Sequence, residues 1–234
     1  MMETMLKTLR EGLPNLKLEL PEGADEKLCQ FGCAVVEQNK VMNLTAITEP
    51  DQVAKLHLLD CLTVLTMADL KGKQLIDVGC GAGFPGVPLK IACPELKLTL
   101  LDSLGKRMNR LESILPTLGV DARYITARAE EAVTDRREKY DFATSRAVAR
   151  LNILLELTAP YVKVGGAVLA MKGSAGREEL EEAKNAIRQL GLKVEKVESF
   201  PMDGTEHMVI LLRKVAPTPA RFPRRYAKIK QSPL

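Results

Sequence analysis

The sequence predicts an α/β fold in which helices cover an open, seven-stranded, mostly parallel sheet whose last strand is antiparallel. From residue 74 onward, short strand-like apolar runs alternate with stretches of helical length and periodicity. The last two runs are joined by only six residues, PMDGTE. Since six residues are too few for a parallel crossover, these runs are expected to form an antiparallel hairpin at one edge. Helical spacing alone precedes the first run, which predicts an N-terminal helical extension.

The N-terminal extension is expected to occupy residues 1–72. Apolar side chains recur at helical spacing between Asp25 and Met42 and again between Asp51 and Leu70. A proline at position 50, just before Asp51, is typical of a helix start.

The sheet domain is expected to occupy residues 73–214. Its strand-like runs are, in order, QLIDV, KLTLLD, ARYIT, YDFATS, GAVLAM, KVEKVESF and HMVILLRK. The stretches 85–92, 103–118, 148–161 and 174–190 have the length and periodicity of the helices that connect parallel strands.

Residues 215–234 form a basic, proline-rich tail for which no regular structure is expected. The tail carries five basic residues and no acidic one, while the whole chain has a formal net charge of +4. The positive charge is therefore a property of the tail. Together with the aromatic residues Phe222 and Tyr226, it predicts contact with nucleic-acid phosphates and bases.

Composition excludes several classes of protein. No apolar run reaches the length of a membrane-spanning helix. The first 16 residues lack the features of a secretory signal, so the expected location is cytoplasmic. The five cysteines have no CxxC spacing and are expected to be reduced. Two histidines, His57 and His207, are too few for a zinc site, and no metal is expected.

The stretch DVGCGAGFPG, residues 77–86, is the strongest functional signal in the chain. It follows the first strand-like run, and ligands of open α/β sheets bind at the carboxyl ends of strands. Glycines at 79, 81 and 83 permit positive φ and let backbone N–H groups approach a ligand. We therefore expect this turn to hold a ligand.

Two carboxylates narrow the choice of ligand. Asp77, at the end of the first strand, would repel a pyrophosphate and attract an amino group. Asp102, at the end of the second strand, is placed to accept hydrogen bonds from ribose hydroxyls. A GxGxxG match at Gly81, Gly83 and Gly86 keeps a nicotinamide-dependent oxidoreductase as an alternative. An amino group and a ribose without a pyrophosphate fit S-adenosylmethionine.

Other short motifs accompany the glycine turn along the chain. They are NLT at 43–45, HLLDCL at 57–62, GFPG at 83–86, AE at 129–130, SRA at 145–147 and KG at 172–173. With these motifs the chain resembles the RsmG (GidB) family of bacterial 16S rRNA guanine-N7 methyltransferases over nearly its whole length. The resemblance implies a Rossmann-like class I methyltransferase fold, S-adenosylmethionine as cofactor, and a target guanine in the decoding-centre loop of 16S rRNA.

The resemblance also implies which residues form the cofactor site. The glycine turn is expected to border the cofactor. Asp102 and Ser103, at the end of the second strand, are expected to contact its ribose, and the AE pair is expected to lie near its adenine. Arg146 is expected near both cofactor and target base and is the catalytic candidate. From the residues alone, RAEEA is equally typical of a helix start. The expected cofactor contacts are Asp77, Gly79, Gly81, Gly83, Phe84, Asp102, Ser103, Ala129, Glu130 and Arg146.

RNA contacts are expected from basic residues and from two motif residues. Without the resemblance, His57 between leucines is typical of a core residue and Asn43 of a loop cap. The tail resembles the family pattern RxPRKxGxPxKxPL, from which it departs at Ala227 and Ile229. The expected RNA contacts are Asn43, His57, Arg107, Arg123, Lys172, Arg221, Arg224, Arg225 and Lys228.

Guanine N7 fits a chain with few candidate catalytic side chains. Its exposed lone pair accepts a methyl group without first losing a proton, so alignment and electrostatics suffice. Motifs of other methyl transfers are poorly matched: the nearest string to the amino-methylating (D/N/S)PP(Y/F) pattern is TAPY at 158–161, which we interpret as a helix stop. The expected partner is 16S rRNA in the 30S subunit or a precursor, with no membrane and no obligate protein partner. An RNA-binding protein without methyl transfer remains the non-enzymatic alternative.

Overall fold

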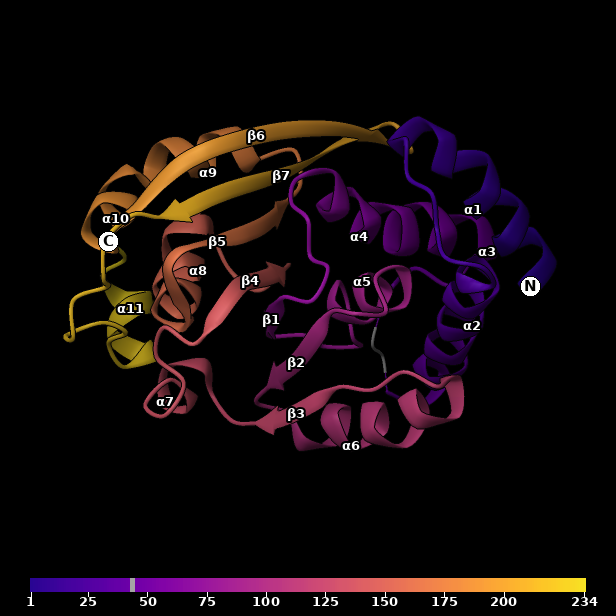
Figure 1. Ribbon diagram of the computed structural model, residues 1–234, viewed down its shortest axis with the longest axis horizontal. Coiled ribbons are helices and arrows are strands. Elements are labelled where there is room, and N and C mark those ends of the chain that lie inside the picture. Colours follow the sequence, from indigo (N-terminus) through magenta and orange to yellow (C-terminus); the bar gives the residue numbers. More distant parts are fainter. Residues whose placement is uncertain (43–44) are drawn as a thin grey trace.

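The computed structural model describes residues 1–42 and 45–234 and confirms the predicted α/β class (Figure 1). Its strands are β1 (Gln74–Val78), β2 (Lys97–Asp102), β3 (Arg123–Thr126), β4 (Tyr140–Arg146), β5 (Val162–Lys172), β6 (Leu192–Met202) and β7 (Thr205–Lys214). They form one seven-stranded sheet in the order β3-β2-β1-β4-β5-β7-β6. Strands β3, β2, β1, β4 and β5 are parallel, and β7 is antiparallel to both β5 and β6. The predicted hairpin and reversed last strand are confirmed.

The described part of the N-terminal extension is mostly helical. Its elements are α1 (Met2–Leu16), α2 (Ala24–Met42), α3 (Pro50–Val53), the π-helix η1 (Ala54–Leu59), α4 (Asp60–Leu62) and the 3₁₀ turn η2 (Thr63–Thr66). Proline at the first position of α3 confirms the predicted helix start. A π-helical turn inside a helix is often found at functional sites. The HLLDCL motif begins in η1 and ends in α4.

The helices of the sheet domain partly follow the predicted boundaries. They are α5 (Gly86–Ala92), α6 (Gly105–Ile114), η3 (Leu115–Leu118), α7 (Ala129–Ala132), α8 (Leu151–Thr158), η4 (Ala159–Tyr161), α9 (Gly176–Glu182) and α10 (Lys184–Gln189). The helix expected from 148 begins only at Leu151, because residues 147–150 form a loop after β4. The stretch RAEEA does start a short helix, α7.

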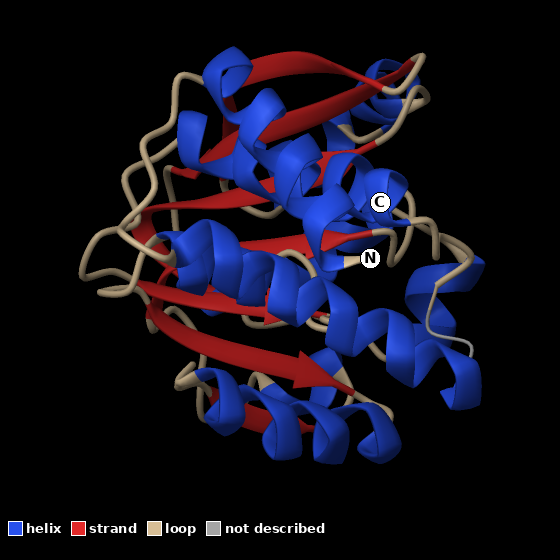
Figure 2. Cartoon of the chain, turned by 90° about the vertical axis from the view of Figure 1, so that its right-hand side faces the viewer, coloured by secondary structure: helices blue, strands red, loops and turns tan. Residues whose placement is uncertain are grey.

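Both faces of the sheet are covered (Figures 1 and 2). The N-terminal helices and α5 pack on one face, and α8, α9 and α10 pack on the other. Successive residues of β1 show the alternation: Leu75 belongs to the first hydrophobic cluster, whereas Ile76 and Val78 belong to the second. Met5 and Leu9 of α1 are fully buried in the first cluster, so the extension shares a core with the sheet.

The tail departs from its prediction, because it is anchored and ends in a helix, α11 (Tyr226–Gln231). Phe222 and Ile229 are buried. Arg224 forms a two-pronged ion pair with the fully buried carboxylate of Glu156, at 2.8 and 2.6 Å. Proline content and missing periodicity did not reveal this order, because it depends on contacts with residues far away in the sequence.

All five cysteines are free thiols, as predicted. None of the described helices combines the length and hydropathy that crossing a membrane requires.

Candidate functional site

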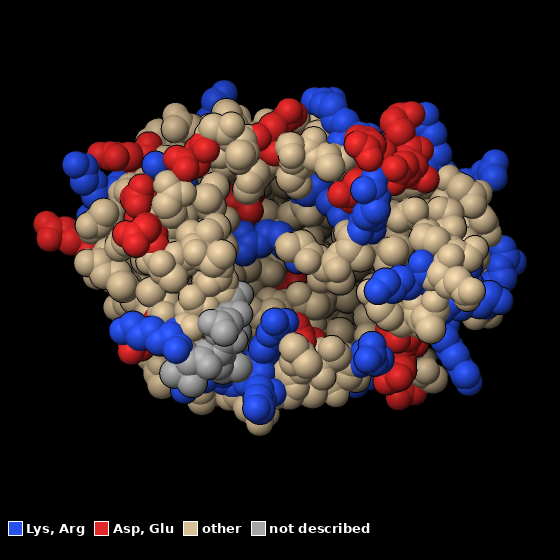
Figure 3. Space-filling model, turned by 180° about the vertical axis from the view of Figure 1, so that it is seen from behind, with Lys and Arg blue, Asp and Glu red and all other residues tan. Residues whose placement is uncertain are grey.

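A cavity of about 1010 Å³ lies at the carboxyl ends of β1, β2 and β4. Figure 3 shows the molecule from behind: the surface is hollowed near the centre of this face, with Lys and Arg atoms along the rim. The cavity is lined by the glycine turn, by residues that follow β2, β3 and β4, and by residues from η1 and β7. The N-terminal extension therefore contributes to the same cavity as the sheet.

The glycine turn approaches its neighbours too closely for side chains at some positions. Gly79 has φ +72°, and a Cβ there would lie 2.5 Å from Cγ2 of Val148. At Gly81, with φ +55°, a Cβ would meet no atom within 4 Å, because that position faces open space. Both glycines line the cavity, whereas Gly83 does not and packs instead toward Phe31.

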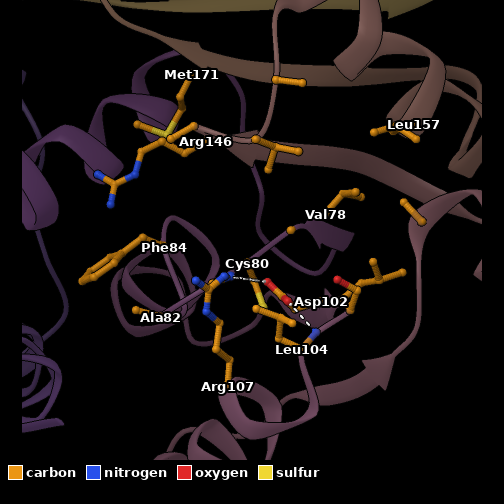
Figure 4. Close-up of a pocket in the computed structure, with 18 of the residues that line it drawn as sticks. Val78, Cys80, Ala82, Phe84, Asp102, Leu104, Arg107, Arg146, Leu157 and Met171 are labelled. Atoms are coloured by element: carbon orange, nitrogen blue, oxygen red, sulfur yellow. Dashed lines mark hydrogen bonds and ion pairs between the residues drawn. The ribbon is translucent and has the colours of Figure 1, made fainter. Parts of the chain in front are cut away.

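Asp102 holds the turn from the end of β2 (Figure 4). One carboxylate oxygen accepts the N–H of Gly81 and the other that of Leu104, both at 2.9 Å. Arg107 lies 3.9 Å from the same carboxylate, at the partly exposed edge of the cavity. Asp102 and the neighbouring Ser103 both line the cavity, and each carboxylate oxygen keeps a further acceptor site for a ligand.

Asp77 does not reach the cavity. Its side chain is completely buried, and one oxygen accepts the N–H of Gly86 at 2.8 Å while the other has no partner among the described residues. Burial raises the pKa of this carboxyl to about 7. The structure therefore places Asp77 beneath the turn and outside the cavity lining, whereas the sequence suggested a place beside an amino group of the ligand.

Arg146 ends β4 and is held from several directions. Its guanidinium donates to Oδ2 of Asp60 and to the carbonyl of Leu56, both at 3.0 Å, and to Nδ1 of His57 at 3.1 Å. It also lies over the ring of Phe84, 5.0 Å from the centroid (Figure 4). Arg146 is therefore fixed in place by the HLLDCL motif before any ligand enters.

His57 is a neutral part of this arrangement. Burial, together with the charge of Arg146, lowers its pKa to about 4. Nδ1 lies 3.1 Å both from Arg146 and from the carbonyl of Leu56. Since a guanidinium can only donate, Nδ1 is assigned as its acceptor and the proton is assigned to Nε2, which donates to Oγ1 of Thr45 at 2.8 Å. The ring stacks on Phe84 with centroids 4.8 Å apart. His57 is thus both buried, as its sequence context predicts, and part of the cavity wall.

The opposite end of the cavity is formed by α7 and α8. Ala129 and Glu130 line it, as expected from the AE motif, and the hydroxyl of Tyr161 donates to the carbonyl of Ala129 at 2.5 Å. Leu157 adds an apolar surface. Tyr226 of the tail also lines the cavity, so the anchored tail is part of its wall.

Lys172 lines the cavity but is already paired. Its ammonium donates to the carbonyl of Ala149 at 2.5 Å and contacts the carboxylate of Glu179 at 2.8 Å. The same carboxylate accepts the N–H of Leu151 at 2.8 Å. This pair clamps the loop that follows β4.

The remaining expected RNA contacts are dispersed. Arg107 lines the cavity, whereas Arg123 lies at the start of β3, at the end of the strand that faces away from the cavity. Arg224 is paired with Glu156. Asn43 lies outside the described residues. The other tail residues are exposed and do not line the cavity: Arg221, Arg225 and Lys228.

Sequence reasoning gave no role to Asp60 or His207, and it expected Tyr226 only as a nucleic-acid contact of the tail, not as part of the cavity wall. Asp60 is buried and binds Arg146 through one oxygen and His207 Nδ1 through the other, at 2.8 Å. The spacing of Asp60, three residues after His57 and therefore on the same helix face, could have indicated its role. Nothing local marks His207, which lies 147 positions away in the chain. The described residues hold no cluster of three or more groups suited to a metal ion.

Comparisons with known proteins identify the family of the chain. A family model described as rRNA small subunit methyltransferase G matches residues 24–209. The Ribosomal RNA small subunit methyltransferase G of Alkaliphilus metalliredigens is 40% identical over 232 residues and 97% of each chain. That of Caldanaerobacter subterraneus subsp. tengcongensis is 41% identical over 100% of each chain.

Solved structures share the fold at low sequence identity. The AdoMet complex of M. jannaschii TYW2 superposes with a TM-score of 0.55 at 13% identity, over 67% of this chain and 75% of that one. A putative methyltransferase from Bacillus halodurans gives 0.55 at 14% identity, over 67% and 99%. The predicted Rossmann-like methyltransferase fold is confirmed. With the family model matching most of its length, the chain belongs to the rRNA small subunit methyltransferase G family.

Proposed function

We propose that this protein transfers the methyl group of S-adenosylmethionine to N7 of a guanine in the decoding-centre loop of 16S rRNA, within the 30S subunit or a precursor. The observation that carries the proposal is the cavity itself. It joins the glycine turn and the carboxylate of Asp102 on one side to an arginine fixed at the end of β4 on the other. The family membership supplies the substrate class.

The residues of the cavity fit the cofactor. Gly81 leaves open space beside the backbone for a ligand, and Asp102 offers acceptors to ribose hydroxyls beside Ser103. Ala129 and Glu130 would border the adenine. Because Asp77 is buried below, its proposed role is to hold the turn against α5 through Gly86.

The Arg146 side of the cavity fits the target base. We use this name for the wall formed by Thr45, His57, Asp60, Arg146, Lys172, Glu179, Thr205 and His207. Ala147, in the loop after β4, has φ +56°, which is rare for a residue with a side chain. Such conformations cluster at functional sites, and the Lys172–Glu179 pair clamps this loop.

Methylation at N7 demands little of the side chains. The N7 lone pair forms the new N–CH₃ bond while the bond from that methyl to sulfur breaks, so the positive charge moves from sulfur to the base and no proton is removed. Alignment of the two reactants in a closed site supplies up to roughly 7–11 kcal/mol of such a barrier. Arg146, with its charge balanced by Asp60, contributes orientation without repelling the cationic product.

The test is incubation with labelled S-adenosylmethionine and 30S subunits from a strain that lacks this activity, followed by mapping of the labelled nucleotide. We expect label at N7 of one guanine. Label at cytosine, at adenine or on protein would contradict the proposal. Thermal stabilisation by NAD and not by S-adenosylmethionine would indicate an oxidoreductase, and RNA binding without label would indicate a binding protein.

A further inference from the structure

The charges around the cavity balance each other. Its wall contains four acidic residues, Asp60, Asp102, Glu130 and Glu179, and four basic ones, Arg107, Arg128, Arg146 and Lys172. The neutral His57 adds no charge. The wall of a cavity that would receive polyanionic RNA therefore has no net charge, unless another group supplies a positive charge.

Among the described residues of that wall, His207 is the one remaining titratable side chain that can supply a positive charge near neutral pH. It belongs to β7, and its ring is partly exposed, with 25% of the side chain accessible. Nδ1 is bound to Oδ1 of Asp60 at 2.8 Å. Nε2 has no hydrogen-bond partner among the described residues, so it remains available to a ligand.

The surroundings favour the charged form of His207. The hydrogen bond to Asp60 raises its pKa, against smaller opposing effects of burial and of Arg146. On the same side of the cavity, His57 is neutral and Lys172 is paired with Glu179 at 2.8 Å, while the neighbouring Glu206 pairs with Arg177 of α9 at 3.6 Å. The shared carboxylate places His207 at a fixed distance from Arg146, on the Arg146 side of the cavity.

We propose that the imidazolium of His207, oriented by Asp60, donates a hydrogen bond from Nε2 to a phosphate oxygen of the RNA nucleotide that enters the cavity. The inference rests on the proposed function for the identity of the ligand. The contact gives the wall one net positive charge and makes RNA affinity depend on pH. No proton is transferred to or from the target base.

The experiment measures RNA affinity against salt concentration at pH 6.5 and pH 8.5, with unmodified 30S subunits as the probe. One phosphate contact contributes a slope of about 0.7–0.9 in log K against log salt. The slope of wild type is expected to become shallower by about that amount between pH 6.5 and pH 8.5. His207→Gln is expected to show the shallower slope at both pH values. At pH 6.5 it is expected to bind RNA roughly 10-fold more weakly than wild type, which corresponds to about 1.4 kcal/mol.

Three controls separate this role from a structural one. Glu206→Gln changes the neighbouring residue, which is exposed and does not line the cavity, and is expected to keep the pH-dependent slope. His207→Lys carries a permanent charge and is expected to keep the steep slope at pH 8.5. S-adenosylmethionine affinity, measured by calorimetry, is expected to be unchanged in all variants.

Each result decides the question. A pH-dependent slope that persists in His207→Gln overturns the inference, as does a parallel loss of S-adenosylmethionine affinity, which would mean that His207 acts through Arg146. If wild type methylates guanine N7 and His207→Gln binds RNA like wild type, the inference alone fails. If the pH-dependent slope is lost in His207→Gln but wild type transfers no methyl group, the proposed function alone fails.

Discussion

Single residues of the site are restrained by their neighbours before any ligand enters. Asp60 binds Arg146 and His207 with separate oxygens, and Phe84 lies against both Arg146 and His57. A side chain held in this way loses little freedom when substrate binds, which is the advantage of a preorganised site. Charge at the reaction centre is therefore fixed by the fold and does not depend on substrate contacts.

The buried carboxyl group of Asp77 is expected to make the stability of the protein depend on pH. Its folded pKa of about 7 lies above the ordinary value of 3.8, so the folded state binds the proton more tightly than the unfolded state. The stability of wild type therefore falls, relative to a neutral side chain, as pH rises from about 4 to about 7. Asp77→Asn keeps an oxygen for the Gly86 N–H and is expected to be more stable than wild type at pH 8, by on the order of 2–4 kcal/mol, and equally stable near pH 3.5.

Denaturant unfolding of both proteins across this pH range measures the difference. S-adenosylmethionine affinity of Asp77→Asn is expected to stay within about 3-fold of wild type, a difference well below 1 kcal/mol. A loss of 10-fold or more would show that the carboxylate holds the cofactor's amino group after all, and a pH-independent stability difference would contradict the raised pKa.

At the scale of elements, the site depends on how β1, the turn and the loop after β4 fit together. Gly79 and Cys80 donate their N–H groups to the carbonyl of Leu101, at 2.8 and 3.1 Å, which joins the turn to β2. Val148 packs directly over Gly79 on the other side. The turn is therefore enclosed between two neighbouring strand ends, and a side chain at position 79 would displace one of them.

Gly79→Ala and Gly72→Ala form a matched pair. The two glycines have nearly equal φ, +72° and +70°, but a Cβ at Gly72 would meet nothing within 4 Å. Both variants are expected to lose about 1–2 kcal/mol of stability from the left-handed backbone. Only Gly79→Ala displaces Val148, and its S-adenosylmethionine affinity is expected to fall by roughly 10-fold or more, which corresponds to at least 1.4 kcal/mol. Equal affinities in calorimetry would mean that the loop after β4 moves without consequence for the cofactor.

Across the whole molecule, the sequence predicted the features that local patterns encode. The alternation of strands and helices, the hairpin and the glycine turn are short-range features, and all were confirmed. Strand periodicity could have predicted the burial of Asp77, because Asp77 shares a face of β1 with the buried Leu75. We interpreted its carboxylate as a ligand contact instead. Asp60 lies 86 positions from Arg146 and 147 positions from His207 in the sequence, and no local pattern specifies contacts over such separations.

The order of the tail likewise depends on contacts with residues far away in the sequence. Arg224 and Arg225 look alike in sequence, yet Arg224 pairs with Glu156, which is 0% exposed, while Arg225 is exposed. Arg224→Ala leaves a buried carboxylate without its counter-charge and is expected to lose roughly 3 kcal/mol or more of stability. Arg225→Ala is expected to change it by no more than about 0.5 kcal/mol.

Thermal unfolding can resolve this difference, because about 2–4 °C of Tm corresponds to 1 kcal/mol in a chain of this size. Combining Arg224→Ala with Glu156→Gln removes the unpaired charge and is expected to recover part of the loss, which a mere change of tail packing would not do. Equal effects of the two arginine substitutions would mean that the tail is not anchored through Glu156. Since Tyr226 follows these residues and lines the cavity, Arg224→Ala is also expected to weaken S-adenosylmethionine binding, whereas Arg225→Ala is expected to affect RNA binding alone.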